Sequence, residues 1–302
     1  MEVVSLFSGC GGTDLGFEQA GHQVIWSNDS DKRACQTYEA NFGFSPNHGD
    51  IKEQRMFPKA QILVGCYPCQ GFSLYGKRDL EDPRNYLYLE FIRALRQVKP
   101  KYFVTENVKG LMYGYGATIY EAMIRGFRSA GYITYKKLIN AKDYGVPQDR
   151  ERVFIVGVRE EITEKYVFPE PTHGLGLSKY ISLRKAIGGM AKPKDDDVYW
   201  GSFSSHYMSR NRKRKWRDVS YTIQASGRHA PLHPSGNPMI YVGKDHWMFG
   251  GGENRRLSFK ECARIQTFPK SYKFSGTLEE KYKQIGNAVP PLLAKAFAET
   301  FQ

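Results

Sequence analysis

Two cysteines, Cys66 and Cys69, stand three positions apart in the stretch GCYPCQGFS, residues 65–73. A structural zinc site usually takes four ligands from two such pairs, but the sequence has no second Cys-x-x-Cys and its seven histidines show no ligand spacing. A redox pair normally opens a helix, and residues 70–74 are a poor helix start. Two interpretations stay open: Cys69 is a nucleophile, or it is a buried structural thiol, the commonest state of a free cysteine.

Three charged residues lie at the ends of two other apolar runs. Glu106 follows the run 102–104, and Arg150 and Arg152 precede the run 153–158. Glu106 ends the run Tyr102–Val104, where a partly buried carboxyl can stay protonated and act as an acid. Arg150 and Arg152 stand two positions apart, so in a strand both side chains face the same side. Beside an acid and a thiol they would form a polar binding wall. The alternatives are a helix N-cap or a salt-bridge partner for Glu106, and a surface ladder of ion pairs with Asp149 and Glu151 for the arginines.

A glycine-rich loop, residues 7–12 (FSGCGG), lies between an expected strand and an amphipathic helix. Glycines allow a ligand to approach the backbone closely. Asp29 ends the next apolar run, where its carboxylate can accept hydrogen bonds from a ribose. The spacing Gly9-x-Gly11-Gly12 departs from the dinucleotide fingerprint. By itself the loop therefore leaves a nucleoside-containing cofactor and a plain tight turn as alternatives.

Apolar runs alternating with amphipathic stretches predict the framework that positions these residues. Strands are expected at 3–7, 24–26, 62–64, 102–104 and 153–158, with helices after residue 12 and over 31–42 and 86–97. This alternation predicts an α/β fold with a doubly wound, mostly parallel sheet, whose ligands bind outside the carboxyl ends of the strands. The loop, Asp29, Cys69 and Glu106 each follow such a strand, so we expect them along one edge.

The pattern changes after about residue 165, where Pro, Gly, Ser, Arg and aromatic residues are interleaved with little helical period. This composition predicts a smaller, irregular, β-rich module that extends to about residue 277. Helical periodicity returns over 278–302. We therefore expect a discontinuous large domain over 1–177 and 278–302, and a second domain with a hinge over 178–277.

The charge of the chain indicates its partner. The 302 residues include 44 Lys and Arg against 31 Asp and Glu, a net charge of +13. Part of the excess lies between residues 201 and 230, a segment with seven basic residues and one acidic residue. Such a surface attracts polyanions, so we expect contact with nucleic acid. The sequence shows no membrane span or signal peptide, and scattered cysteines fit the reducing cytoplasm.

Taken together, these stretches resemble the DNA (cytosine-5) methyltransferase family in nearly all of its ordered motifs. The similar segments, in chain order, are 7–16, 65–73, 106–108, 148–152, 255–269 and 284–290. The resemblance implies the fold of S-adenosylmethionine-dependent methyltransferases, with S-adenosyl-L-methionine as the methyl donor. The cofactor-binding residues that it implies are Phe7, Gly9, Gly11, Gly12, Leu15, Asp29, Asp50, Ile51, Pro68 and Asn287.

The same resemblance implies that Cys69, Glu106, Arg150 and Arg152 are catalytic. Carbon 5 of cytosine is a poor nucleophile, and a thiolate of Cys69 that adds at carbon 6 makes it enamine-like. Glu106 would donate a proton at N3, Arg152 would hold O2, and Arg150 would orient the pocket. The target base must be flipped out of the duplex. Cys66 stands where the family more often has a small or apolar residue. A disulfide between Cys66 and Cys69 would occupy the nucleophilic sulfur and inactivate the enzyme.

Residues 208–234 are similar to the target-recognition region of the HaeIII methyltransferase, which modifies GGCC. This resemblance implies a GGCC-like site in duplex DNA, read by the domain over 178–277. The arginines expected on guanine edges are Arg210, Arg212 and Arg228. The residues expected on phosphates are Lys213, Arg214 and Lys215.

Other functions remain as alternatives. A cytosine-5 methyltransferase acting on tRNA is one, and the basic middle segment favours DNA over it. An inactive DNA-binding protein with the same fold is another, against which Cys69, Glu106 and Arg152 argue. A redox or zinc protein is a third. The size indicates a monomeric modification enzyme, with a cognate restriction endonuclease as a possible partner.

Overall fold

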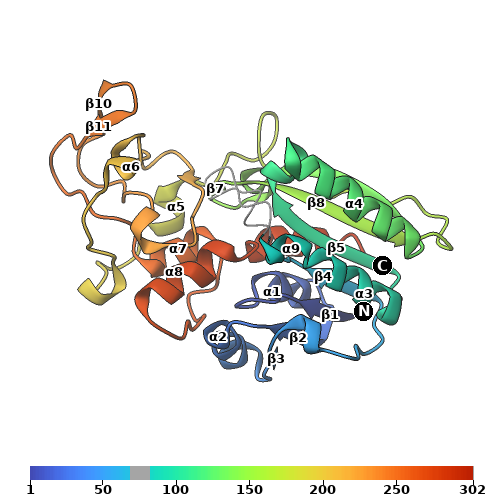
Figure 1. Cartoon of the computed structure of the whole chain (residues 1–302). Helices are drawn as coiled ribbons and strands as arrows, with labels where there is room; N and C mark the ends of the chain where they lie inside the picture. Colours follow the sequence, from blue (N-terminus) through green and yellow to red (C-terminus); the bar gives the residue numbers. More distant parts are fainter. Residues whose placement is uncertain (69–81, 302) are drawn as a thin grey trace. The chain divides into compact units, whose positions relative to one another are not determined.

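The computed structural model describes residues 1–68 and 82–301, which form two compact units (Figure 1). Unit 1 comprises Met1–Asn140, Glu151–Glu170 and Ala294–Gln302. Unit 2 comprises Ala141–Arg150 and Pro171–Leu293. Cys69, the expected nucleophile, lies outside the described residues.

Unit 1 is built on a seven-stranded sheet in the order β3-β2-β1-β4-β5-β8-β6. The strands are β1 (Glu2–Leu6), β2 (Gln23–Asp29), β3 (Asn47–His48), β4 (Ile62–Gly65), β5 (Tyr102–Val108), β6 (Tyr132–Asn140) and β8 (Glu151–Arg159). All neighbouring pairs from β3 to β5 are parallel, whereas β8 runs antiparallel to both β5 and β6. This arrangement confirms the expected mostly parallel sheet.

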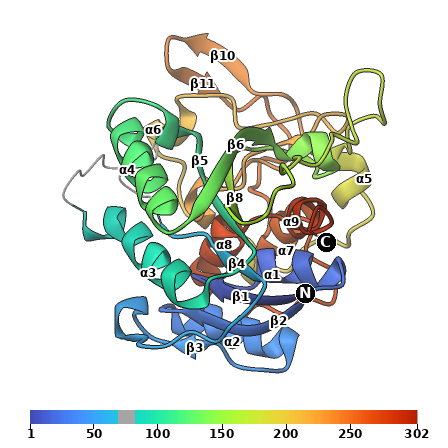
Figure 2. The same ribbon diagram turned by 90° about the vertical axis from the view of Figure 1, so that its right-hand side faces the viewer.

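Helices cover both faces of this sheet, which makes it doubly wound. They are α1 (Gly12–Gln19), α2 (Lys32–Phe42), α3 (Tyr88–Val98), α4 (Tyr115–Ser129) and the end of α9 (Pro291–Ala298). Figure 2 shows α3 and α4 on one side of the strands, with α1 and α9 on the other. Because both faces are covered, all four residues of β4 are buried. Short 3-10 turns are formed by Ile51–Glu53, Pro83–Tyr86 and Lys109–Met112.

Aromatic rings fill the space between the sheet and the pair α3 and α4. Phe103 of β5 lies 5.6 Å from Phe91 and 4.7 Å from Phe127, measured between ring centroids. The end of β4 has no room for a side chain, since a Cβ on Gly65 would come 2.5 Å from the ring of Phe91. This packing fixes the point where the chain leaves β4 toward Cys66.

The C-terminal segment completes the opposite face of unit 1. Phe297 stacks on Phe154 of β8 with centroids 4.0 Å apart, and Phe301 stacks on Phe17 of α1 at 6.2 Å. The ring of His22 is hydrogen-bonded to the carbonyl of Ala298 through Nε2 at 2.9 Å. These contacts join the C-terminal segment to β8 and to the α1 region.

Three features of the sheet differ from the expected pattern. Strand β6 was not expected, because most of its residues are half-buried or exposed and give no continuous apolar run. The 153–158 segment is antiparallel, a direction that the apolar run itself does not reveal. Glu106 lies inside β5 and not beyond its end, because the strand continues to Val108.

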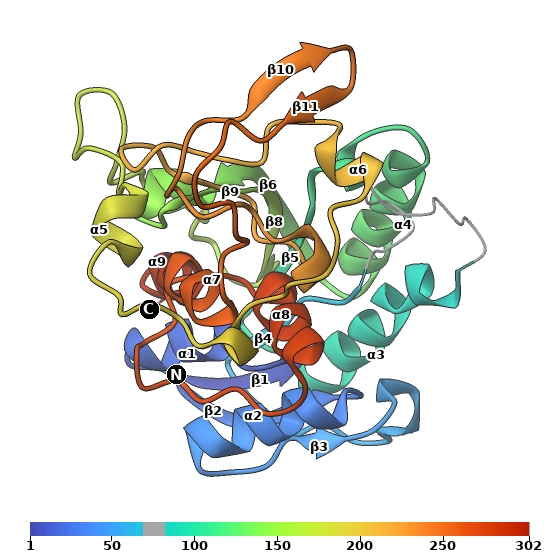
Figure 3. The same ribbon diagram turned by 90° about the vertical axis from the view of Figure 1, so that its left-hand side faces the viewer.

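Unit 2 is an irregular assembly of short elements (Figure 3). Its helices are α5 (Leu183–Ile187), α6 (Ser205–Met208), α7 (Phe259–Ile265) and α8 (Leu278–Asn287), with 3-10 turns at Ala141–Tyr144, Asp195–Asp197 and Gly227–His229. Its strands are β7 (Gln148–Asp149), β9 (Ser220–Tyr221), β10 (Ile240–Gly243) and β11 (His246–Met248). The module is irregular as expected, but its strands are shorter than a β-rich domain would have.

The compact units end at other residues than the expected domains. Residues 141–150 and 278–293 belong to unit 2, because buried polar contacts tie them there. Gln148 Nε2 donates to Gln266 Oε1 at 2.7 Å, and the hydroxyl of Tyr282 donates to the carbonyl of Leu257 at 2.7 Å. Hydrogen bonds between residues far apart in the sequence do not affect hydrophobic periodicity. The expected domain boundaries therefore differ from those of the compact units.

Candidate active site

The glycine loop leaves β1 in an unusual backbone conformation. Phe7 has a φ of 56°, Gly9 of 55° and Gly11 of 84°, values in the left-handed region. Gly11 caps the start of α1 in this conformation, which glycine adopts without steric cost. A Cβ built on Gly9 meets no atom within 4 Å, so open space lies beside the loop. A ligand can therefore approach the loop backbone.

Asp29 joins this loop to the end of β2. Its Oδ2 accepts a hydrogen bond from the backbone N–H of Gly9 at 2.8 Å, and its Oδ1 accepts one from the N–H of Asp31 at 2.8 Å. The N–H of Ser8 also donates to the carbonyl of Asn28 at 3.0 Å. The two expected cofactor segments are therefore in direct contact at one edge of the sheet.

The next strand brings Asp50 and Ile51 to the same edge. Strand β3 pairs with β2 in the register Asp29↔His48, and the N–H of Gly49 donates to the carbonyl of Asp29 at 3.1 Å. Asp50 is exposed and caps the following turn by accepting from the N–H of Lys52 at 2.9 Å, while Ile51 is 3% exposed. These positions are compatible with the expected roles.

The remaining expected cofactor residues divide between the two units. Leu15 and Pro68 are half-buried in unit 1, as is Phe7, whose ring lies 6.1 Å from that of Tyr67 in an edge-on contact. Asn287 lies at the end of α8 in unit 2.

A buried acid next to the loop escaped the sequence analysis. Asp14 of α1 is 1% exposed and accepts hydrogen bonds from Ser5 Oγ at 2.7 Å and from the hydroxyl of Tyr38 at 2.8 Å. Burial raises the pKa of Asp14 to about 7, against the effect of both hydrogen bonds. This one side chain ties β1, α1 and α2 together. The only signal was an acid among the apolar residues of an amphipathic helix.

Glu106 and Arg152 meet on one face of the antiparallel pair β5 and β8. Arg152 stands opposite Val108, and Glu106 precedes Val108 by two residues, so all three side chains face the same side. Arg152 Nε lies 2.9 Å from Glu106 Oε1, with side chains 15% and 10% exposed. Burial lowers the pKa of Arg152, and the nearby Glu106 carboxylate opposes that shift. The pair provides a cation and a carboxyl in a largely dry environment.

Cys66 lies close to this pair and to α1. Its Sγ is 3.7 Å from the hydroxyl of Thr13. Burial, reinforced by the charge of Glu106, raises the pKa of Cys66 to about 12. Cys66 is therefore a neutral thiol near pH 7, unsuited to act as a nucleophile. The disulfide with Cys69 stays a prediction, since Cys69 lies outside the described residues.

Arg150 does not share the strand of Arg152, contrary to the sequence pattern. It falls between β7 and β8, where the chain passes from unit 2 to unit 1. Its guanidinium is buried and donates to the backbone carbonyls of Ile223 at 3.2 Å, Gly286 at 3.1 Å and Ala288 at 3.2 Å. These contacts hold unit 2 together, and its expected role in orienting the pocket stays a prediction.

The expected DNA contacts of Arg212 and Lys213 are not supported by their surroundings. Arg212 is 7% exposed, and its Nε donates to the carbonyl of Tyr207 at 3.0 Å. Lys213 is also 7% exposed, and its Nζ donates to Ser235 O at 2.7 Å and Asn254 Oδ1 at 2.8 Å. Both side chains donate hydrogen bonds within unit 2. Its strands are short, so many of its backbone carbonyls need hydrogen-bond donors other than a neighbouring strand.

The other basic residues of the segment are more accessible. Lys215 and Arg228 are exposed, and Arg210 is half-buried. Arg214 lies 3.8 Å from the Asp149 carboxylate and 4.0 Å above the Tyr221 ring. These four residues remain predicted DNA contacts.

Residues 1–68 and 82–301 contain no group of three or more His, Cys, Asp or Glu side chains that is placed to hold a metal ion. Within the same ranges, no helix is long and apolar enough to cross a membrane.

Comparisons with known proteins relate the whole chain to one family. Residues 1–302 match the family described as C-5 cytosine-specific DNA methylase. The Type II methyltransferase M.BsuRI of Bacillus subtilis is 48% identical over 346 aligned residues, which cover 99% of this chain and 78% of the relative. M.BspRI of Lysinibacillus sphaericus is 46% identical and covers 99% and 80%. The S. pombe Dnmt2 methyltransferase shares the fold, with a TM-score of 0.72, 18% identity and coverage of 98% and 96%.

Proposed function

The chain belongs to the family of C-5 cytosine-specific DNA methylases, and we propose that it methylates a flipped-out cytosine in a GGCC-like duplex site through a covalent adduct of Cys69. The observation that carries the chemistry is the buried pair of Glu106 and Arg152, 2.9 Å apart at the end of β5 and the start of β8. An acid and a guanidinium on one face match the N3 and O2 atoms of a cytosine.

The roles of the residues follow from the electron flow. The thiolate of Cys69 forms a bond to carbon 6, and the electrons of the 5,6 double bond then make carbon 5 nucleophilic. Negative charge grows on N3 and O2. Glu106 in its carboxylic-acid form donates its proton to N3 and becomes the carboxylate paired with Arg152, and Arg152 donates hydrogen bonds to O2. After methyl transfer, a base removes the proton from carbon 5 and the Cys69 sulfur leaves. No side chain is assigned as that base.

S-adenosyl-L-methionine fits the edge of unit 1 formed by the glycine loop and Asp29. The open space beside Gly9 allows the cofactor to approach the backbone, and the neighbouring Asp29 carboxylate is a hydrogen-bond acceptor for ribose hydroxyls. The half-buried Phe7 and Leu15 supply apolar surface, and the buried Ile51 supports this edge from the core. When bound, the cofactor supplies the electrophilic methyl group.

The target rests on the resemblance of residues 208–234 to a GGCC-specific recognition region. The exposed Arg228 and half-buried Arg210 are the arginines we propose for guanine edges, since bidentate guanidinium contacts read O6 and N7. Lys215 and Arg214 are the proposed phosphate contacts. We propose that the enzyme acts as a monomer, that Arg150 supports the pocket and that Asn287 completes the cofactor site.

Labelled S-adenosylmethionine tests this function with three acceptors: a duplex with one GGCC site, a duplex of scrambled sequence, and tRNA. We expect label only in the GGCC duplex, on carbon 5 of one cytosine of the site. Label in other DNA would keep the cytosine chemistry and discard the target. Label in tRNA alone would overturn the choice of duplex DNA.

A further inference from the structure

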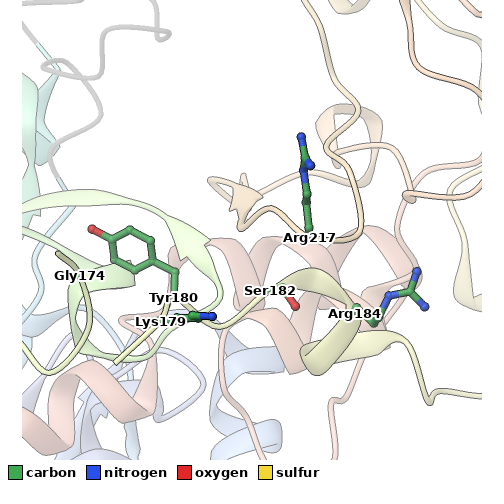
Figure 4. Close-up of a pocket in the computed structure, with 6 residues that line it drawn as sticks. All are labelled: Gly174, Lys179, Tyr180, Ser182, Arg184 and Arg217. Atoms are coloured by element: carbon green, nitrogen blue, oxygen red, sulfur yellow. The ribbon is translucent and has the colours of Figure 1, made fainter. Parts of the chain in front are cut away.

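A basic hollow of about 570 Å³ opens on the surface of unit 2, and its lining includes none of the individual residues assigned above to DNA contacts. Its lining residues are Gly174, Lys179, Tyr180, Ser182, Arg184 and Arg217. Figure 4 shows Lys179 and Tyr180 toward one end and Arg184 toward the other, with Arg217 on a separate segment, its side chain extending away from the other three in this view. The lining thus includes three cations and no acid.

Backbone hydrogen bonds fix the two segments that carry the arginines. The N–H of Leu183 donates to the carbonyl of Asp218 at 2.8 Å, and the N–H of Arg184 donates to the carbonyl of Trp216 at 2.9 Å. The guanidinium of Arg184 also lies 5.4 Å above the Trp216 ring. Arg184 and Arg217 are therefore held beside one another by the fold itself.

The cationic side chains of the hollow differ from the buried Lys213 in their exposure and in their partners. Lys179, Arg184 and Arg217 are exposed, and within the described part of the chain none of them forms an ion pair with a carboxylate. Lys213, by contrast, is satisfied by oxygens of unit 2. Exposed cations that line one hollow without a paired carboxylate attract an anion with several charges.

We propose that this hollow binds phosphates of the DNA backbone without reading sequence, an inference that rests on duplex DNA being the substrate. Ammonium, guanidinium and hydroxyl groups are the side chains that contact phosphates in DNA complexes. Base edges lie on the floor of a groove and require a protruding helix, ribbon or loop to reach them. A concave surface instead receives the convex ridge of the phosphate backbone.

Salt dependence of binding tests the proposal. Fluorescence anisotropy would measure the affinity of the whole chain for a GGCC duplex and a scrambled duplex between about 50 and 300 mM salt. The variant is K179A/R217A, with K179R/R217K to retain both charges and Lys270→Ala, an exposed lysine of unit 2 outside the hollow, as the control. Circular dichroism and urea unfolding of the whole chain would verify that each variant is folded.

The K179A/R217A variant should bind both duplexes more weakly by the same factor, on the order of tenfold or more near 0.1 M salt. The slope of log affinity against log salt should become shallower by about 1.8, since each lost phosphate contact removes about 0.9. The charge-retaining variant and Lys270→Ala should behave as wild type.

Three results would overturn the proposal: an unchanged slope, a loss confined to the GGCC duplex, or weaker binding of a duplex RNA with DNA binding unaffected. The second would indicate base reading and the third a different nucleic acid. Binding to the scrambled duplex requires neither methyl transfer nor the correct target. Failure of the hollow and failure of the proposed function are therefore separate outcomes.

Discussion

Arg152 Nε lies 2.9 Å from Glu106 Oε1, and this contact sets the first prediction. Glu106→Gln keeps the shape of the side chain but removes the acid, so methyl transfer should fall by about 10²–10⁴-fold. Titration with S-adenosylmethionine should give wild-type affinity, because Glu106 belongs to β5 and not to the glycine loop. Equal losses of cofactor affinity and turnover would mean that Glu106 supports the cofactor site instead.

Arg152→Ala should be more damaging than Arg152→Lys. Removing the guanidinium leaves the largely buried Glu106 carboxylate without its cation, which costs stability as well as activity. Lysine retains a charge but not the planar fork, so it should restore stability more than turnover. Urea unfolding and initial rates, measured side by side, check the order. A lysine variant with full activity would rule out a geometric role for the guanidinium.

Arg150 belongs to the same segment, 148–152, as Arg152, but its contacts are structural. Arg150→Ala leaves buried carbonyls of unit 2 unsatisfied and should lower the free energy of unfolding by on the order of 3 kcal/mol. Methyl transfer per folded molecule at low temperature should fall less than in Arg152→Ala, because Arg150 supports the pocket indirectly, through the backbone of unit 2. If stability is unaffected and turnover is lost, Arg150 acts on the pocket as the family resemblance implies.

Cys66 should be dispensable and slow to react. Its pKa of about 12 keeps the thiol protonated at about pH 8, so iodoacetamide should label it far more slowly than a free cysteine peptide. Cys66→Ala should retain methyl transfer, since the variant leaves the Glu106–Arg152 pair intact. Mass spectrometry of tryptic peptides follows the labelling. Rapid alkylation of Cys66 would contradict the assignment of a neutral thiol.

Asp14 should make stability depend on pH. Its pKa is near 3.8 in the unfolded chain and about 7 when folded, so the folded state binds the proton more tightly. Stability from this group is present at low pH and is lost as pH rises from about 4 to about 7. Asp14→Asn should flatten that part of the profile. Urea denaturation across this pH range measures it, and an unchanged slope in the variant would contradict the shift.

The strands and helices of unit 1 could be predicted from sequence more fully than the polar contacts between them. The apolar runs of β1, β4 and β5 are buried on both faces, and such strands leave a continuous hydrophobic signal. The half-exposed β6 leaves none. The glycine loop and Asp29 were predicted as neighbours because the ends of adjacent parallel strands meet at one edge.

What sequence could not reveal is which polar side chains turn inward. Arg212 and Lys213 lie in a basic run that looks solvated, yet both are buried on backbone oxygens. Lys179 and Arg217 lie far apart in sequence but line one hollow, and periodicity cannot place them together. Asp14 was hidden for the same reason, since its hydroxyl partners come from β1 and α2.

Formation of an adduct by Cys69 tests the central claim most directly. The last step removes the proton from carbon 5, so fluorine at that position in the target cytosine should block release and trap the covalent product. With S-adenosylmethionine present, wild type and Cys66→Ala should give a protein–DNA species that survives denaturation, and Cys69→Ser should give none. An adduct that forms in Cys69→Ser, or none in an active wild type, would contradict the account.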